Sequence, residues 1–502
     1  MSHTKKQLDK AFLLRALVTA LAVFLAAHAF CYFNLSLRGS SLMLNAEKTN
    51  SSAIIKGQVL QPFYWRLRGG ISSPFLIGLL SFLYLFGAAL ILSRLFRIRK
   101  TVPFAVFCCI LFISPALLEL NVSSLFTADA VCLAFLLMTA GSAVLLAPDL
   151  LPWPAVLRML LGFLLLCGGT CLAPDLSNIF VCIAAVYALS RCLAAKDAEN
   201  AESAEEAAQP LRPAQILSAF IVYAAALGAS LAVMLFFCRR TGSDLEVRLI
   251  PADGRSYLTS LALPFTSLFV PVTIYPVLLP VVRIILLGAG LFGIIKHPRA
   301  ALFVLLLVPA MVFPVLGTGM QQFPFQLIFL DIACLMLIMR IKPGQETAGR
   351  IFRYVLRGAY AVLFIGCLVF FNHAYLKVNL DFQTSLAVVT QIISRLEDRD
   401  DFRPPATQVA FLGSLADSPL VASREGFEHL RVLRALDGNT SLTDPSQLTW
   451  YFWETLGYPM NCLSDYEQEQ FASLPEVESI PVFPHPESIR PVGETLVIRL
   501  SE

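Results

Sequence analysis

Long apolar runs constrain this chain more than any other feature of its sequence. Runs of about 18 or more apolar residues recur through its first three quarters, and each can cross ~30 Å of hydrocarbon as a helix. Charged residues make up only 15% of the chain, whereas a soluble domain carries roughly a quarter. The sequence therefore predicts a polytopic α-helical membrane protein.

The apolar runs predict about eleven membrane-spanning helices. They lie near residues 11–33, 75–95, 102–121, 129–147, 155–173, 178–193, 214–238, 274–295, 300–317, 324–340 and 351–371. The first run is too long for the apolar core of a cleaved signal peptide. Because Lys and Arg collect in the loops after even-numbered spans, such as 94–100 and 340–350, we expect a multi-pass protein of the cell membrane with a cytoplasmic N-terminus.

The composition changes after Phe371, where acidic residues and turn signals become frequent. TQVAFLG (407–413) and ETLVIRL (494–500) predict buried strands, whereas residues 384–398 and TWYFWETLGY (449–458) predict helices. About 130 residues are enough for an independent core. We therefore expect a transmembrane domain over 1–371 and a small extracytoplasmic α/β domain over 372–502.

Cysteine usage and charge exclude several classes of site. Nearly all of the 12 cysteines lie inside apolar runs, and no Cys or His pair has the spacing of metal ligands. We expect no disulfide, metal or cofactor. The net charge of +3 is divided among the loops, so we expect no nucleic-acid partner. Transporters place ionisable residues near the membrane midplane, but here Glu119 and Asp331 are the main acidic exceptions, which favours an enzyme.

Polar residues gather instead at loop ends on the predicted outer face. The candidate site residues are the carboxylates Glu47, Asp129 and Asp175, the aromatic residues Tyr64 and Trp65, the basic residues Arg66 and Arg68, and the amide Gln322. The aromatic and basic members share one stretch, QPFYWRLRGGISSPF (61–75), which is too polar to span a bilayer. Each candidate has an ordinary alternative: Asp129 suits a helix start, Asp175 a turn, and Trp65 an interfacial belt.

Several stretches, taken in order along the chain, resemble one known family. They are KGQVLQPFYWRLRGGISSPFLIGLLSFLYLF (56–86), TADAVCLAFLLMTAGSAVLL (127–146), FNHAYLKVNLDFQTSLAVVTQIISRLED (371–398), TQVAFLGSL (407–415), YFWETLGYPMN (451–461) and IPVFPHPESIRPVGETLVIRL (480–500). Together they resemble the bacterial type II O-antigen glucosyltransferase family over nearly the whole chain.

The resemblance implies a membrane glycosyltransferase of the GT-C type. Such enzymes move a hexose, glucose in the named family, from a polyprenyl-phosphate sugar at the outer face to an envelope polysaccharide or glycolipid. The transfer requires a base that takes the proton of the acceptor hydroxyl. We expect Glu47 to be this base and Asp129 to orient the reactants or replace Glu47.

The remaining candidates fit the contacts that a lipid-linked sugar requires. Arg66 and Arg68 would hold the lipid phosphate, since a guanidinium group binds phosphate with two parallel hydrogen bonds. Tyr64 or Trp65 would stack on the sugar or anchor in the interface. Asp175 and Gln322 are further expected substrate contacts. The lipid bilayer is the remaining expected partner.

The chain also departs from the family at two motifs. Residues 57–59 are GQV where members often have Gly-Arg-Trp, and CLAPDLSN (171–178) stands where members usually have a Gly-x-Tyr-Gln turn. These departures keep three alternatives open: another lipid-linked sugar transferase, a lipid or polysaccharide flippase, and an inactive envelope scaffold.

Overall fold

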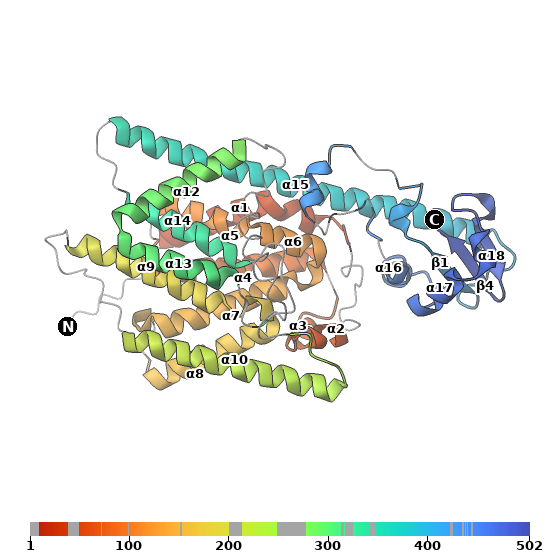
Figure 1. The fold of residues 1–502 in the computed structure, drawn as a ribbon, viewed down its shortest axis with the longest axis horizontal. Coiled ribbons are helices and arrows are strands. Elements are labelled where there is room, and N and C mark those ends of the chain that lie inside the picture. Colours follow the sequence, from red (N-terminus) through yellow and green to blue (C-terminus); the bar gives the residue numbers. More distant parts are fainter. Residues whose placement is uncertain are drawn as a thin grey trace.

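The computed structural model describes most of the chain. The described residues are 10–38, 50–71, 73–98, 100–150, 153–199, 213–247, 278–312, 316, 325–341, 347–421, 425–433, 436, 438, 440–442 and 445–501. The long helices lie side by side in a bundle, and the strands gather beyond one end of it (Figure 1).

Helices account for the larger part of the fold. Those up to the end of the bundle are α1 (Lys10–Phe33), α2 (Asn50–Ile55), α3 (Gln61–Leu67), α4 (Pro74–Leu95), α5 (Thr101–Phe112), α6 (Pro115–Ser123), α7 (Ala128–Leu146), α8 (Ala155–Leu172), α9 (Ile179–Glu199), α10 (Pro213–Thr241), α12 (Leu278–Lys296), α13 (Pro298–Val312), α14 (Ile328–Arg340) and α15 (Thr347–Glu397). Within the described ranges, eight helical segments are long and apolar enough to cross a membrane. The chain is thus a polytopic helical protein.

The eight long segments coincide with eight of the predicted spans, namely the first seven and the last. The other three predicted spans correspond to α12, α13 and α14, which are not among the eight, so the count of eleven stays a prediction. The third span differs from a single helix, because α5 ends before Ser114 and α6 begins at Pro115. Proline has no N–H to continue the ladder of α5, which explains the break.

The centre of the bundle is formed by α7 and α9. In their apolar segments 72% and 78% of the residues are buried, against 28% for α10. Close packing of α7 on α8 depends on glycine: a Cβ added at Gly169 would lie 2.7 Å from Cγ of Met138, and one at Gly162 would lie 2.6 Å from Cδ2 of Leu145. Small residues let membrane helices approach closely, and here they fix the position of α7 against α8.

The longest helix, α15, passes through the predicted domain boundary without a break. It has 51 residues and is therefore about 75 Å long. It runs along the bundle and continues beyond it to the sheet (Figure 1). The predicted helix over 384–398 is the last part of this helix rather than a separate element.

A four-stranded sheet forms the core of the C-terminal part. Its elements and the helices around it are β1 (Gln408–Leu412), α16 (Pro445–Trp450), the π-helical turn Tyr451–Leu456, β2 (Asn461–Cys462), α17 (Asp465–Ala472), α18 (Pro475–Glu478), β3 (Ile489–Val492) and β4 (Thr495–Arg499). The strand order is β2-β1-β4-β3, with β1 parallel to both neighbours and β3 antiparallel to β4. The strands predicted near 407–413 and 494–500 are confirmed as β1 and β4.

The two faces of this sheet pack against different helices. Val409 and Phe411 belong to the large core that includes α15, whereas Ala410 and Leu412 pack with Val477 of α18. Successive side chains of a strand point to opposite faces, so β1 is buried on both. This explains why β1 is a continuous apolar run in the sequence.

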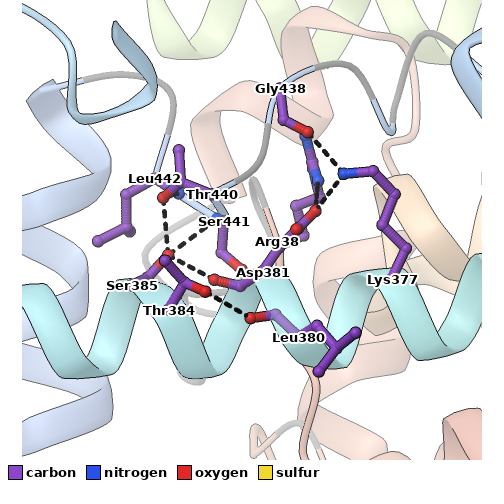
Figure 2. A network of polar contacts seen from close by, with 10 residues as sticks. All are labelled: Arg38, Lys377, Leu380, Asp381, Thr384, Ser385, Gly438, Thr440, Ser441 and Leu442. Carbon is purple, nitrogen blue, oxygen red and sulfur yellow. Dashed lines mark hydrogen bonds and ion pairs between the residues drawn. The ribbon is translucent and has the colours of Figure 1, made fainter. Parts of the chain in front are cut away.

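A buried polar network joins α15 to the segment after α1, to residue 438 and to residues 440–442 (Figure 2). The Asp381 carboxylate accepts from Arg38 and Lys377, each at 2.8 Å, and Lys377 also donates to the Gly438 carbonyl at 2.6 Å. One turn further along α15, the Ser385 hydroxyl lies 2.7 Å from that of Thr440. The first helix and the C-terminal part are therefore tied together where α15 leaves the bundle.

Candidate functional site

Part of the polar stretch between α1 and α4 forms the short helix α3. Pro62 occupies its first turn, where a missing N–H costs nothing. The helix ends at Leu67, and the following Gly69 and Gly70 have φ angles of 101° and 75°, which suit glycine and turn the chain toward α4.

Side chains of α3 and the residue after it are anchored to the start of α7. Nη1 of Arg68 lies 2.5 Å from Oδ1 of Asp129 and also donates to the carbonyl of Phe126 at 3.0 Å. The Tyr64 hydroxyl donates to Oδ2 of Asp129 at 2.8 Å, and the amide of Ala130 donates to Oδ1 at 3.0 Å. We call Tyr64, Arg68 and Asp129 the α3–α7 anchor.

The α3–α7 anchor is almost completely buried. The side chain of Asp129 has no exposed surface, and that of Arg68 is 1% exposed. Burial, followed by the adjacent Asp129 carboxylate, raises the pKa of the Tyr64 hydroxyl. Both carboxylate oxygens of Asp129 have partners, so this group fixes α3 in place and presents no free surface to a substrate.

A second set of contacts joins α3 to the end of α8. Nε2 of Gln61 donates to the carbonyl of Leu172 at 2.9 Å. The ring of Trp65 is 1% exposed, and its centroid lies 5.5 Å from that of Phe126. Trp65 therefore packs inside the protein and has no open face for a sugar, whereas Arg66 is exposed on the other side of the helix.

Beside the α3–α7 anchor lies a cavity of about 220 Å³. The described residues that line it are Gln58, Ala116, Glu119, Leu120, Ser123, Ser124, Thr127, Val131, Ala173, Asp175, Leu176 and Phe325. It lies near the end of the bundle that is closer to the sheet, where α6 ends and α7 begins (Figure 1). The lining residues thus include two with carboxylates, three with hydroxyl groups and one with an amide, and we call this space the carboxylate cavity.

Asp175 reaches the carboxylate cavity from a tight turn between α8 and α9. The turn is a single 3-10 segment, Pro174–Leu176. Gln326 holds it, because its Nε2 donates to the Asp175 carbonyl at 2.8 Å and to Oδ1 of Asn178 at 2.5 Å. Residues about 150 positions apart in the sequence therefore fix the backbone that presents Asp175.

Glu119 reaches the carboxylate cavity from α6. The break before Pro115 separates this short helix from α5. The Ser123 hydroxyl donates to the Glu119 carbonyl at 2.7 Å, which closes the last turn of α6 next to the cavity. The two carboxylates thus come from different segments, a short helix and a turn, at the same end of the bundle.

The structure brings some of the predicted site residues together. The α3–α7 anchor contains three of them, but none of the three is among the residues that line the carboxylate cavity. Asp175 does line it. Glu47 and Gln322 lie outside the described residues.

Two cavity residues, Glu119 and Gln58, were absent from the predicted site. Glu119 is the only carboxylate in the third apolar run, and an isolated charge in such a run is itself a functional signal. Gln58 stands in the motif where the chain departs from the family it resembles. The isolated charge and the changed motif are both visible in the sequence, but neither predicts that Glu119 and Gln58 line the same cavity as Asp175.

The described residues contain no group of three or more His, Cys, Asp or Glu side chains placed to hold a metal ion. Comparison of the chain with family models, with curated proteins and with solved structures gives no match.

Proposed function

We propose that the chain is a membrane glycosyltransferase that moves a hexose from a polyprenyl-phosphate sugar to a cell-envelope glycan. Two features beyond the family resemblance support the proposal. The chain is a polytopic helical protein, and its carboxylate cavity lies near one end of the bundle, where the headgroup of a membrane lipid would be found.

The observation that carries the proposal is the convergence of Glu119 and Asp175 on one cavity. Glu119 and Asp175 are only partly buried, so their side chains are partly exposed at the end of an apolar bundle, and ionisable residues placed there are candidates for a functional site. Sugar transfer requires a base for the acceptor hydroxyl, and a carboxylate can fill this role. Serine, threonine and glutamine side chains around the two carboxylates offer hydrogen bonds to sugar hydroxyls.

In the proposed reaction the acceptor oxygen forms a bond to C1 of the sugar as the bond from C1 to the phosphate oxygen breaks. The acceptor proton passes to a carboxylate, and the bonding electron pair leaves with the phosphate. Asp175 and Glu119 are proposed as candidates for the base, in addition to Glu47 of the first loop. Arg66, which is exposed on α3, is the proposed phosphate contact.

The buried α3–α7 anchor has a positioning role in this proposal. Because it fixes α3 against α7, it also fixes where Arg66 projects from α3. A reacting group that is misplaced by about 1 Å can lose about a hundredfold in rate. The anchor therefore affects transfer through geometry.

The proposal includes the membrane arrangement. We propose that α12, α13 and α14 complete a set of eleven spans, that the N-terminus is cytoplasmic, and that the sheet and its helices form an extracytoplasmic domain near the carboxylate cavity. The Lys and Arg bias of alternate loops supports this orientation.

Transfer of labelled glucose from polyprenyl-phosphate glucose to the native envelope glycan tests the proposal. Glu119→Gln and Asp175→Asn are measured separately. We expect the variant that removes the base to lower the transfer rate by about 10²–10⁴-fold. Asp244→Asn is the matched control, since Asp244 is an exposed carboxylate after α10 that does not line the cavity. Parental rates in both cavity variants would exclude the carboxylate cavity as the reaction site.

Two further arms separate the alternatives. A panel of polyprenyl-phosphate sugars identifies another lipid-linked transferase by transfer of a different hexose. Proteoliposomes containing labelled lipid detect a flippase, which moves the lipid without forming a new glycosidic bond. Absence of any transfer, with retained binding of the glycan, would favour the scaffold alternative over the proposed enzyme.

A further inference from the structure

A second and larger cavity lies at the other end of the bundle. Its volume is about 750 Å³. It is enclosed by the connection from α4 to α5, the C-terminal end of α14 and the first turns of α15. Residues 357 and 397 of α15 are separated by about 60 Å of helix, so this cavity is far from the sheet and on the opposite side of the bundle (Figure 1).

Five basic side chains line this cavity. They are Arg97, Lys100, Arg340, Arg353 and Arg357. None of the described residues that line it is Asp or Glu. Arg97 and Arg340 are close enough for their positive charges to interact. Five positive charges around one cavity attract an anion to it.

The backbone at Arg97 adds an independent observation. Its φ angle is 60°, and it is the only residue other than glycine with a positive φ in the described part of the chain. This position follows the end of α4, where a left-handed residue is usually glycine. An arginine here costs conformational energy and places a cation at the cavity.

The rest of the lining is apolar. Phe96, Val106, Leu335, Phe352 and Leu356 are among the residues that form it. The apolar surface therefore continues from the charged rim into the space between α5, α14 and α15. A free phosphate ion gains nothing from contact with an apolar surface, whereas burial of a lipid tail against it is favourable.

The apolar space extends further into the bundle. Tyr360 of α15 lines both this cavity and a smaller one of about 60 Å³. The smaller cavity contains the ion pair between Arg283 and Asp331, whose Nη2 and Oδ1 atoms are 2.7 Å apart. The partly buried ion pair between α12 and α14 thus lies next to the cavity, with Tyr360 of α15 between them.

We infer that this cavity binds an anionic phospholipid, with its phosphate at the basic rim and an acyl chain against the apolar wall. Basic pockets between transmembrane helices on the cytoplasmic side are suited to such headgroups. The ends of α4, α14 and the start of α15 would lie at the membrane surface, where the headgroup is found. The inference is independent of the proposed glycosyl transfer at the other end of the bundle.

Native mass spectrometry of the full-length chain in detergent tests this inference. The probes are phosphatidylglycerol, phosphatidylcholine and inorganic phosphate. We expect phosphatidylglycerol to bind more tightly than phosphatidylcholine and to resist displacement by inorganic phosphate. Arg357→Gln should weaken phosphatidylglycerol binding about fivefold, because each basic residue near a lipid surface contributes about that factor.

The matched control is Arg350→Gln, since Arg350 is an exposed arginine two turns earlier on α15 that does not line the cavity. Lys100→Gln supplies a second cavity variant, just before α5, and should give the same weakening as Arg357→Gln. The inference is overturned if the cavity variants bind like the control. It is also overturned if phosphatidylcholine binds as tightly as phosphatidylglycerol, or if inorganic phosphate displaces the lipid.

Discussion

The α3–α7 anchor is a group of polar side chains that is closed to solvent. Asp129 has two hydrogen-bonded oxygens and no exposed surface. Arg68 is less completely satisfied, since its Nε and Nη2 atoms have no hydrogen-bond partner in the described structure. Removing one member of such a buried pair leaves the other charged and alone, which costs more than the pair contributes.

We therefore predict that Asp129→Asn destabilises the protein by about 3–5 kcal/mol, because Arg68 loses its counter-charge in a buried site. Thermal unfolding in detergent measures the change. The double variant Asp129→Asn with Arg68→Met should be more stable than Asp129→Asn alone, since no buried charge remains. If Asp129→Asn unfolds at the parental temperature and loses transfer activity, Asp129 has the catalytic role that its sequence position suggested.

The sequence could identify candidate site residues, but it could not predict which of them contact one another. Tyr64, Arg68 and Asp129 stand out as polar residues between apolar runs. Their separation of about 60 positions along the chain gives no sign that they touch. The sequence gives a weaker indication that Glu119 is a site residue, because its apolar neighbours predict a membrane span around it.

Close packing of α7 and α8 determines where two loop ends of the candidate site lie. Asp129 opens α7, and the turn that carries Asp175 follows α8. Gly169 of α8 faces α7 so closely that an added Cβ would lie 2.7 Å from Cγ of Met138 and 3.1 Å from the Ala134 carbonyl. The backbone carbonyl cannot rotate away, so the helices themselves must separate.

We predict that Gly169→Val destabilises the protein by about 1–3 kcal/mol, because it overpacks the contact between α7 and α8. Gly168→Val is the matched control: it changes the next residue of the same helix, where an added Cβ meets its nearest neighbour at 3.6 Å. Melting temperatures of both variants in one detergent provide the measurement. Equal melting temperatures would contradict the close contact.

The helices of the bundle could be predicted from apolar runs, but their ends could not. Hydropathy falls after Phe371, and the sequence therefore predicted a boundary there. No Gly or Pro occurs between Cys367 and Arg403, so nothing in that stretch breaks the helix. A change of composition marks where α15 leaves an apolar environment, not where the helix ends. By contrast, Pro115 ended α5 inside an apolar run.

At the scale of the whole molecule, Asp381 connects parts that are far apart in the sequence. Its carboxylate accepts from Arg38 and Lys377, and Lys377 also reaches Gly438 (Figure 2). Two buried cations share this one carboxylate. The network is the place where the end of α1, the middle of α15 and the C-terminal part meet.

We predict that Asp381→Asn destabilises the attachment of these parts by about 3–5 kcal/mol, because two buried cations lose their counter-charge. Hydrogen exchange should become faster both near Arg38 and over residues 440–442. Asp401→Asn is the control, since Asp401 pairs with Arg399 at the surface, and an exposed pair contributes at most about 1 kcal/mol. Unchanged exchange in Asp381→Asn would show that apolar contacts alone hold the parts together.

The unbroken helix α15 also has a mechanical consequence. Its first turns carry basic side chains of the 750 Å³ cavity, and its last turns share the apolar core with the sheet. The two ends are therefore connected by one continuous helix. A tilt of about 5° around its start displaces a point about 60 Å along the helix by about 5 Å. A ligand bound in the cavity at the first turns of α15 is therefore connected through a single helix to the C-terminal part.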